Sequence, residues 1–560
     1  MQNYLKQADE LLNDIYSYIN PTDMERCREK YKKPSDFNVS PNGDEEWIFM
    51  RTRMGYLKSL ILAYETINDI VYINKIYSII DEYIENHREI KISLSTRTLD
   101  LGIFLENVIK TIDYLKENKL ISKERLKEYI SYMKKVCEYL FENYMPWYDQ
   151  SNWGFIQMSS IYMYSYKYNE LKFMEKSFKY MKKQLKCQVE KDGFHYERST
   201  TYHYQILICL QNLVKLNSDD KEYFMKYLKK MTIAASKMYY PNMIQINCGD
   251  SDEMNVSEIL KISYELMGEK FIHKNHTSLL KHSGYFNMIK EDFSISSYLT
   301  KMSSGHIHLD LAHFNYYNKK PIIVDNGRYT YREIEQRLDL KSVYAHNTIV
   351  IDNNPYTKPL SSWEYDKQYP KVNNIDLEEI SEDVKIVTMS YYDSRNSAYI
   401  ERKLIIIEKN LIVQTNVFCK GKHKLKLNFN LHPNIEIKDY ILDNRIKFTG
   451  KNLSMHKSKY SKEYNIIENS LKIEDNIEFN DEAYLTNMVL EDEIEELEVI
   501  RENKVINSDY VKAYILKSKK KDYIIFMRNK DEYIGTNSYY VNNEPKYNNL
   551  VIDIMKKNIL

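Results

Sequence analysis

Apolar residues in the first half of the chain recur at the spacing expected of helices that bury one face. In the segments 99–117, 122–144 and 202–216, apolar side chains fall at positions i, i+3, i+4 and i+7. This spacing places them along one side of a helix, and short polar stretches separate the segments. The first half of the chain is therefore predicted to be a helical bundle, a solenoid or an α/α toroid, and no fixed sequence repeat chooses among these.

The hydrophobic pattern changes near residue 280. From there on, short runs rich in β-branched and aromatic residues dominate, such as 293–301 and 384–392, with Asn, Asp, Gly and Pro between them. So many strands at this spacing predict a large antiparallel β-sandwich, and the fold class is α+β multidomain. The predicted domains are a helical domain (1–275), a β-sandwich domain that carries the candidate site (276–435) and a C-terminal, β-rich continuation of the sandwich (436–560).

Charge and cysteine content narrow the class of partner and compartment. The 560 residues include 80 Lys and Arg and 80 Asp and Glu, so no overall field attracts nucleic acid or a membrane surface. The six Cys are scattered without a CxxC spacing, which indicates reduced thiols. The first 21 residues have an amphipathic helix pattern rather than that of a signal peptide, and no run of 18 apolar residues predicts a membrane span. We expect a cytoplasmic protein, with a periplasmic or secreted location as the alternative and the oligomeric state open.

The segment 303–348 concentrates residues that can do chemistry. It holds four of the 13 His, with Asp310 and Asp325 near them, and much of it has a β-strand pattern. The six residues are His306, His308, Asp310, His313, Asp325 and His346. On a strand, side chains two residues apart share a face, so the first three are expected to converge. The segment is therefore a candidate catalytic or metal centre.

Two metal sites can be drawn from this segment. His308, Asp325 and His346 form a two-imidazole, one-carboxylate set of the kind that binds zinc. Alternatively, His308, Asp310 and His346 form the facial triad of a non-haem iron oxygenase. The same residues can also be explained as separate hydrogen-bonded groups in turns.

Polar residues in the helical half lie beside predicted helix starts. The segments 149–158 and 192–204 contain Asn152, Glu197, Arg198, Tyr202 and His203. Loops and helix ends on one side of a helical domain can line a cleft, although each residue alone can be a cap or a buried hydrogen-bonding group. Together with the histidines they suggest a site at the interface of two domains. Asp250 and Asp252, in a predicted turn, are interpreted as structural.

Four stretches carry a resemblance to a known family. They are DGFHYERSTTYHY (192–204), SGYFNMIK (283–290), GHIHLDLAHFNYYNKKPIIVDNGRYTY (305–331) and AHNTIVIDN (345–353). In combination the chain resembles the heparinase II/III-like polysaccharide lyases, from about residue 150 to 355. The resemblance implies an incomplete α/α toroid followed by an antiparallel β-sandwich. It also implies a lyase that cleaves an acidic, uronate-containing poly- or oligosaccharide by β-elimination.

The resemblance also implies a role for individual residues. His306 would be the catalytic base, Tyr202 would donate or also remove a proton, and Asn152 would contact the substrate carboxylate. A zinc-type ion would be held by His308, Asp325 and His346. Further substrate contacts would come from Trp153, Glu197, Arg198, His203, Tyr204 and Tyr331, and the match at Tyr202 can also slip to Tyr204. Trp153 departs from the Asn-His pair of many family branches, so a base on that side is missing.

Two other functions remain open at this stage. A chain without a visible signal peptide can be a non-catalytic glycan-binding or surface-polysaccharide-assembly protein of the same fold. The iron triad would instead make it an oxygenase.

Overall fold

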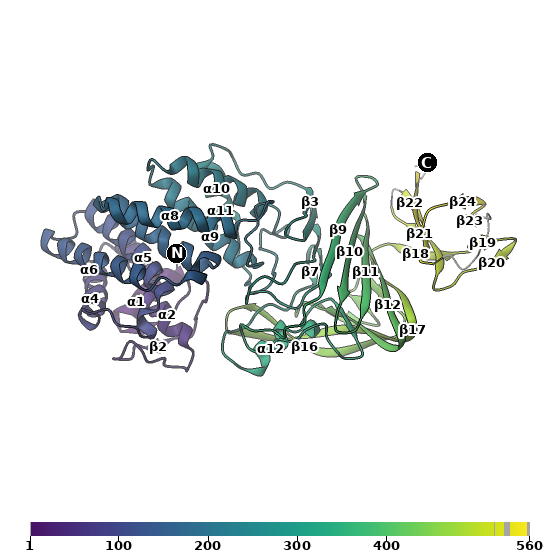
Figure 1. The fold of residues 1–560 in the computed structure, drawn as a ribbon, viewed down its shortest axis with the longest axis horizontal. Helices are drawn as coiled ribbons and strands as arrows, with labels where there is room; N and C mark the ends of the chain where they lie inside the picture. The colour runs from purple at the N-terminus through teal and green to yellow at the C-terminus, as the bar shows by residue number, and fades with distance from the viewer. Residues whose placement is uncertain (1, 520, 531–537, 557–560) are drawn as a thin grey trace.

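The computed structural model describes residues 2–519, 521–530 and 538–556 (Figure 1). A helical part precedes a part built of antiparallel sheets, and the change falls between Leu266, where the last helix of the first part ends, and His276, where the next strand begins. The predicted order of a helical domain and a β domain is confirmed. Among the described residues, no helix combines the length and apolarity needed to cross a membrane, and all six cysteines are free thiols.

Helices of the first part pack in two layers. The helices α5, α7 and α9 bury most of their residues and pack on one another in sequence, whereas α6, α8 and α10 bury fewer than half and cover them from outside. This alternation of buried and covering helices is the arrangement of an α/α toroid. The helices are α1 (Gln2–Leu12), α2 (Glu45–Arg53), α3 (Leu57–Ile67), α4 (Val71–Asn86), α5 (Thr98–Glu117), α6 (Lys123–Glu142), α7 (Asn152–Tyr168), α8 (Leu171–Gln188), α9 (Thr200–Lys215), α10 (Lys221–Ala235) and α11 (Ser257–Leu266).

The inner helices α7 and α9 both begin at the side of the helical part that meets the sheets. Ser151 caps α7 by accepting a hydrogen bond from the Trp153 backbone N–H, and Ser199 caps α9 in the same way with Tyr202. A serine at this position satisfies a backbone donor that the helix itself leaves free. Both caps fix where the first helical side chains point, and these include Asn152 and Tyr202.

A five-stranded sheet lies between the helices and a larger sheet in Figure 1. It consists of β3 (His276–Leu280), β4 (Tyr285–Lys290), β5 (Phe293–Tyr298), β6 (His313–Asn318) and β7 (Lys320–Ile323), paired in this order. Both of its faces are covered. One packs on helical-domain residues such as Phe194 and Tyr240, and the other packs on the large sheet through Phe293, Phe314 and Phe429. The residues of β5 and β6 are accordingly all buried.

The large antiparallel sheet extends on both sides of residue 435, because β12 pairs with β17 over most of its length. Its strands are β8 (Ile349–Ile351), β9 (Lys371–Glu379), β10 (Val384–Asp393), β11 (Ala398–Ile407), β12 (Asn410–Asn430), β13 (Ile437–Lys438), β14 (Ile441–Leu442), β15 (Ile446–Thr449), β16 (Leu453–Glu463) and β17 (Ile466–Leu490). Beyond it lie two small sheets, one of β18 (Glu493–Leu497), β21 (Val511–Lys517), β22 (Lys521–Arg528) and β25 (Leu550–Lys556), the other of β19 (Ile500–Arg501), β20 (Lys504–Val505), β23 (Tyr539–Val541) and β24 (Glu544–Lys546).

Candidate active site at the domain interface

His306 lies in the loop that joins β5 to β6. The strand predicted for His306, His308 and Asp310 is wrong. Residues 299–312 form a loop that turns at Gly305, and β6 begins only at His313. His306 Nδ1 is 3.1 Å from Asp250 Oδ2, and its Nε2 is 3.8 Å from Glu197 Oε2. The imidazole centroid is 4.0 Å from that of the Tyr202 ring. His306 therefore joins groups from the helical part to groups from the β part.

Asp250 connects His306 to His308. Its Oδ1 lies 3.0 Å from His308 Nε2, and both of its oxygens pair with Arg337 of the short helix α12 (Glu335–Lys341). Burial alone would raise the pKa of Asp250, but Arg337 and the two imidazoles hold it well below its usual value. An ionised carboxylate can only accept hydrogen bonds. A neutral imidazole at His306 then carries its proton on Nδ1 and one at His308 carries it on Nε2, so that the lone pairs lie on His306 Nε2 and His308 Nδ1.

Gly249 makes this close approach of the two segments possible. Its φ of +57° lies in the left-handed region, and a Cβ added there would be 2.5 Å from the His306 carbonyl oxygen and 3.0 Å from that of Arg198. Any other residue would push these backbones apart. The Asp250 backbone N–H donates to the same His306 carbonyl at 2.8 Å, so the turn is anchored directly to the His306 loop.

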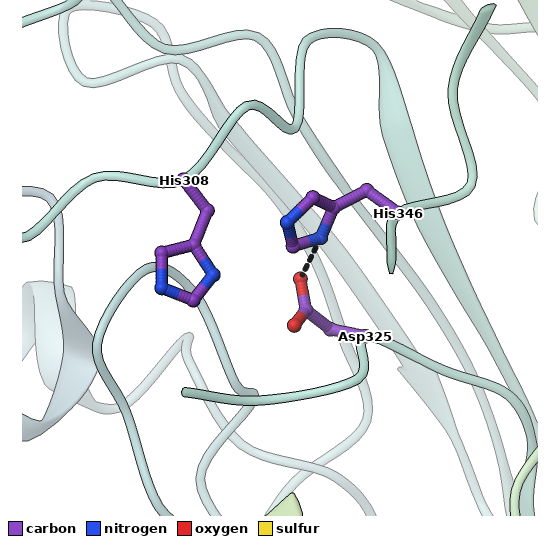
Figure 2. Close-up of side chains that lie close together, drawn as sticks. All are labelled: His308, Asp325 and His346. Carbon is purple, nitrogen blue, oxygen red and sulfur yellow. Dashed lines mark hydrogen bonds and ion pairs between the residues drawn. The ribbon is translucent and has the colours of Figure 1, made fainter. Parts of the chain in front are cut away.

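His308, Asp325 and His346 come together as a buried group whose donor atoms lie within 4.8 Å of one another (Figure 2). Asp325 follows β7, and His346 precedes β8. Asp325 Oδ2 is 3.0 Å from His346 Nδ1. Within the described part of the chain, His308 Nδ1 and His346 Nε2 are buried without a hydrogen-bond partner. Two orphaned imidazole nitrogens beside a carboxylate fit a divalent ion of the zinc type.

The pKa shifts of His308 and Asp325 suit metal binding, whereas for His346 burial would lower the pKa but Asp325 raises it above its usual value. Burial lowers the pKa of His308 to about 4, against the opposing effect of Asp250, so its Nδ1 lone pair is free at neutral pH. Burial would raise the pKa of Asp325, but His346 lowers it below the usual value. Asp310 lies outside this group and places its carboxylate 3.9 Å from Cys248 Sγ. The described residues therefore bring together the zinc-type set rather than the iron triad.

The Tyr202 hydroxyl lies in a chain of hydrogen bonds. It contacts the Tyr331 hydroxyl and lies 3.1 Å from Glu25 Oε1, while Arg328 Nη1 donates to the Tyr331 oxygen at 2.7 Å. Burial raises the pKa of Tyr202 well above its usual value, and Tyr331 and Glu25 raise it further. Tyr202 is therefore a neutral phenol at physiological pH, in contact with the His306 ring.

Asn152 and Glu197 form a second pair beside His306. Glu197 accepts hydrogen bonds from the Asn152 backbone N–H at 2.9 Å and from its Nδ2 at 2.8 Å. An amide nitrogen has two hydrogens, so Glu197 uses only one of the two Nδ2 hydrogens of the buried Asn152. Trp153 stands next to this pair, with the Arg97 guanidinium 4.9 Å from its ring and the exposed Trp147 at 5.6 Å.

Three of the predicted substrate-contact residues have partners away from His306. His203 Nε2 contacts the Met231 carbonyl oxygen, and the Tyr204 hydroxyl donates to that of Ala235, both on α10. Arg198 donates to Glu190 at 2.7 Å. Of the two tyrosines between which the sequence match can slip, Tyr202 is the one that lies beside His306.

A cavity of about 510 Å³ opens between the two parts of the molecule next to Tyr331. Its wall includes Phe49 and Arg97 from the helical part and Tyr331, Arg332 and Trp363 from the β part. The Trp363 ring is 46% exposed and stands 5.3 Å from the His306 ring and 4.6 Å from that of Tyr331. An exposed indole beside such a cluster provides a stacking surface for a sugar ring.

Sequence reasoning missed Asp250 as a site residue, together with Arg337, Arg328, Glu25 and Trp363. Asp250 was assigned a structural role because its turn offers only a Gly-Asp pair as a signal. Glu25 offers no local signal, since it lies 177 residues from Tyr202 in the sequence.

Two family models account for nearly the whole chain. Residues 7–277 match the heparinase II/III N-terminus, and residues 273–519 match the heparinase II/III-like C-terminal domain. The chain belongs to the heparinase II/III family. The family predicted from the sequence is therefore confirmed, and with it the polysaccharide lyase class.

Solved structures of similar fold agree with this heparinase II/III assignment. A heparinase III crystal structure superimposes with a TM-score of 0.72 at 14% identity, covering 100% of this chain and 91% of that chain. The heparan sulfate lyase HepC from Pedobacter heparinus gives 0.61 at 13% identity, covering 98% and 90%. The chondroitin AC lyase from Streptomyces coelicolor A3, in complex with chondroitin sulphate, gives 0.51 at 8% identity, covering 94% and 88%. The α/α toroid and β-sandwich are thus confirmed as the fold, whereas a search of curated proteins found no match.

Proposed function

We propose that this heparinase II/III family member cleaves a uronate-containing glycan by β-elimination, with His306 as the base and Tyr202 as the acid. The observation that carries the proposal is the contact between these two side chains, whose rings are 4.0 Å apart at the domain interface. One is an imidazole with a free Nε2, and the other is a neutral phenol. A base and an acid at one place are what elimination across a C–C–O unit requires.

The proposed reaction moves one proton from carbon and one to oxygen. His306 Nε2 takes the C5 proton of the uronate, the C4–O bond breaks as the C4–C5 double bond forms, and the Tyr202 hydroxyl gives its proton to the departing oxygen. Negative charge builds up on the uronate carboxylate as the C5 proton leaves. In this proposal the second Nδ2 hydrogen of Asn152, at the positive end of α7, stabilises this charge.

Glu197 serves two parts of this scheme. By accepting both Asn152 donors it holds the amide in one orientation. Its Oε2, 3.8 Å from His306 Nε2, also stabilises the imidazolium that forms when His306 takes the proton. This role as a support for Asn152 and His306 replaces the direct substrate contact predicted for Glu197 from the sequence.

The cavity beside Tyr331 is the proposed place for the neighbouring sugar. Trp363 offers its exposed face there, while Trp153 and Arg97 continue the surface toward Asn152. The substrate is proposed to be an acidic glycan, with heparan sulfate and chondroitin sulfate, named for two structures of the same fold, as the first candidates.

Incubation with the right glycan should release an unsaturated uronate, detected by the ultraviolet absorbance of the new double bond. The panel should contain heparan sulfate, chondroitin sulfate, alginate and uronate oligosaccharides, with a neutral glucan as the control. The neutral glucan should give no absorbance because it lacks the acidified C5 proton. Glycan binding without any unsaturated product across the panel would overturn the lyase proposal in favour of a glycan-binding protein.

The metal at His308, Asp325 and His346 is proposed to be zinc. It would neutralise the buried Asp325 and use the orphaned nitrogens of both histidines. His308 in turn fixes Asp250, which orients His306. The ion would thus stabilise the orientation of His306 through His308 and Asp250. The proton transfers of the proposed reaction are carried out by His306 and Tyr202.

Zinc removal should therefore lower thermal stability as well as activity. We expect one equivalent of metal in the purified protein, and a melting temperature that falls by several degrees after chelation and returns when zinc is added. His346→Ala should abolish both metal content and the response to zinc. The matched control is His432→Ala, outside the group, which should keep both. The assignment would be contradicted if the purified wild-type protein contains no metal and its melting temperature does not change when zinc is added.

A further inference from the structure

The segment between α1 and α2 crosses from the outside of the helical part to the domain interface. Arg26 pairs with Glu463 of β16 at 3.1 Å and donates to the Glu253 carbonyl oxygen at 3.0 Å, and Arg28 pairs with Glu463 as well. Arg328 donates to the carbonyl oxygen of Met24. These contacts hold residues 24–28 against both halves of the site, although this part of the chain carries no sequence motif.

Glu25 lies at the centre of this segment and contacts the proposed acid. Its Oε1 is 3.1 Å from the Tyr202 hydroxyl, and its Oε2 is 2.6 Å from Arg53 Nη1. The side chain is 3% exposed. Burial alone would raise the pKa of Glu25, but Arg53 and Arg328 lower it below the usual value. Glu25 is therefore a buried anion that accepts the Tyr202 hydrogen bond.

We propose that Glu25 is a positioning residue that keeps Tyr202 protonated, so that Tyr202 acts as the acid and His306 alone acts as the base. This inference rests on the proposed elimination reaction. An anion next to a phenol disfavours the phenolate, so a free Tyr202 phenolate cannot accumulate and compete for the C5 proton. Transfer to the leaving oxygen remains favourable, because an alkoxide is a stronger base than a phenolate.

The other groups around Tyr202 do not replace Glu25. The Tyr331 hydroxyl can donate to or accept from Tyr202, and the His306 ring lies tilted by 34° against the Tyr202 ring. Arg328, which would favour the phenolate, is itself paired with Asp252 at 2.8 Å. Asp250, also negative, is bound by Arg337 and both imidazoles. Glu25 is thus the carboxylate in hydrogen-bond contact with the Tyr202 oxygen.

The test is the pH dependence of kcat in Glu25→Gln. Losing the negative charge lowers the Tyr202 pKa, so the protonated phenol is lost at a lower pH than in the wild type. The alkaline limb of the kcat profile should therefore shift to lower pH. At a pH on this alkaline limb we expect kcat to fall about tenfold or more, while KM stays within about threefold. Glu25→Asp keeps the charge and should restore the alkaline limb, and melting curves establish that each variant is folded.

Glu463→Gln is the matched control, because Glu463 holds the same segment through Arg26 and Arg28 without contacting Tyr202. It should lower the melting temperature and leave the alkaline limb in place. The proposal is overturned if folded Glu25→Gln keeps the wild-type profile, or if Glu463→Gln shifts the limb equally. Absence of unsaturated product with the wild-type protein would instead refute the elimination reaction, and this inference with it.

Discussion

Alanine in place of His306 should lower kcat for formation of the unsaturated product by about 10²- to 10⁴-fold, the usual contribution of a general base. The variant loses the Nε2 lone pair that takes the C5 proton, while Asn152 and the stacking surface of Trp363 stay in place. KM should therefore change much less than kcat. Steady-state kinetics on the best glycan of the panel, followed by ultraviolet absorbance, provide the measurement.

Two controls make the His306 result specific. His282→Ala removes an exposed imidazole from the turn between β3 and β4, and its kinetics should match the wild type. Added imidazole should restore part of the activity of His306→Ala, since the space left by the side chain borders the substrate cavity through Trp363. A His306→Ala enzyme that keeps wild-type kcat would move the role of base to Tyr202 and leave Glu25 with a different task.

Local sequence patterns predicted the helical half, the sheets and the metal group, because each of these depends on residues that are near one another in the chain. Periodicity reports which face of a helix is buried, as for α9, whose apolar positions form the inner layer. Similarly, Asp325 and His346 lie 21 residues apart and flank β7 and β8, two strands that follow one another in the chain. Spacing in the sequence can therefore predict a group of metal-binding residues of this kind.

Contacts that form only in the folded protein could not be predicted from the sequence. Asp250 is 56 residues from His306 and meets it because Gly249 lets two loops of different domains touch. The alternating pattern around His306 and His308 indicated a strand, yet the two imidazoles converge because both reach the same carboxylate from a loop. Likewise, His203 and Tyr204 adjoin Tyr202 in sequence, but successive helical side chains point in different directions, and theirs reach α10.

Asparagine in place of Asp250 should weaken the base and the metal group together. The neutral side chain can turn an N–H toward His306 Nδ1, which would move the imidazole proton to Nε2 and block the base. The substitution also removes the carboxylate that holds His308 in place. Loss of such a supporting carboxylate typically lowers metal affinity or activity 10- to 100-fold. Arg337 would remain buried without its charge partner, at a cost of about 3–5 kcal/mol in stability.

Asp252→Asn separates this specific effect from the general loss of a buried ion pair. Asp252 binds Arg328 through two hydrogen bonds of 2.8 Å and, like Asp250 two residues away, is buried. Both variants should have a lower melting temperature than the wild type. Metal content is then measured at a temperature where both variants are folded, and only Asp250→Asn should have lost bound metal. If the two variants retain equal amounts of metal and lose activity equally, Asp250 acts only through stability. If they differ as expected, one carboxylate links the metal group to the catalytic base, and zinc content and kcat should fall together in any variant that disturbs it.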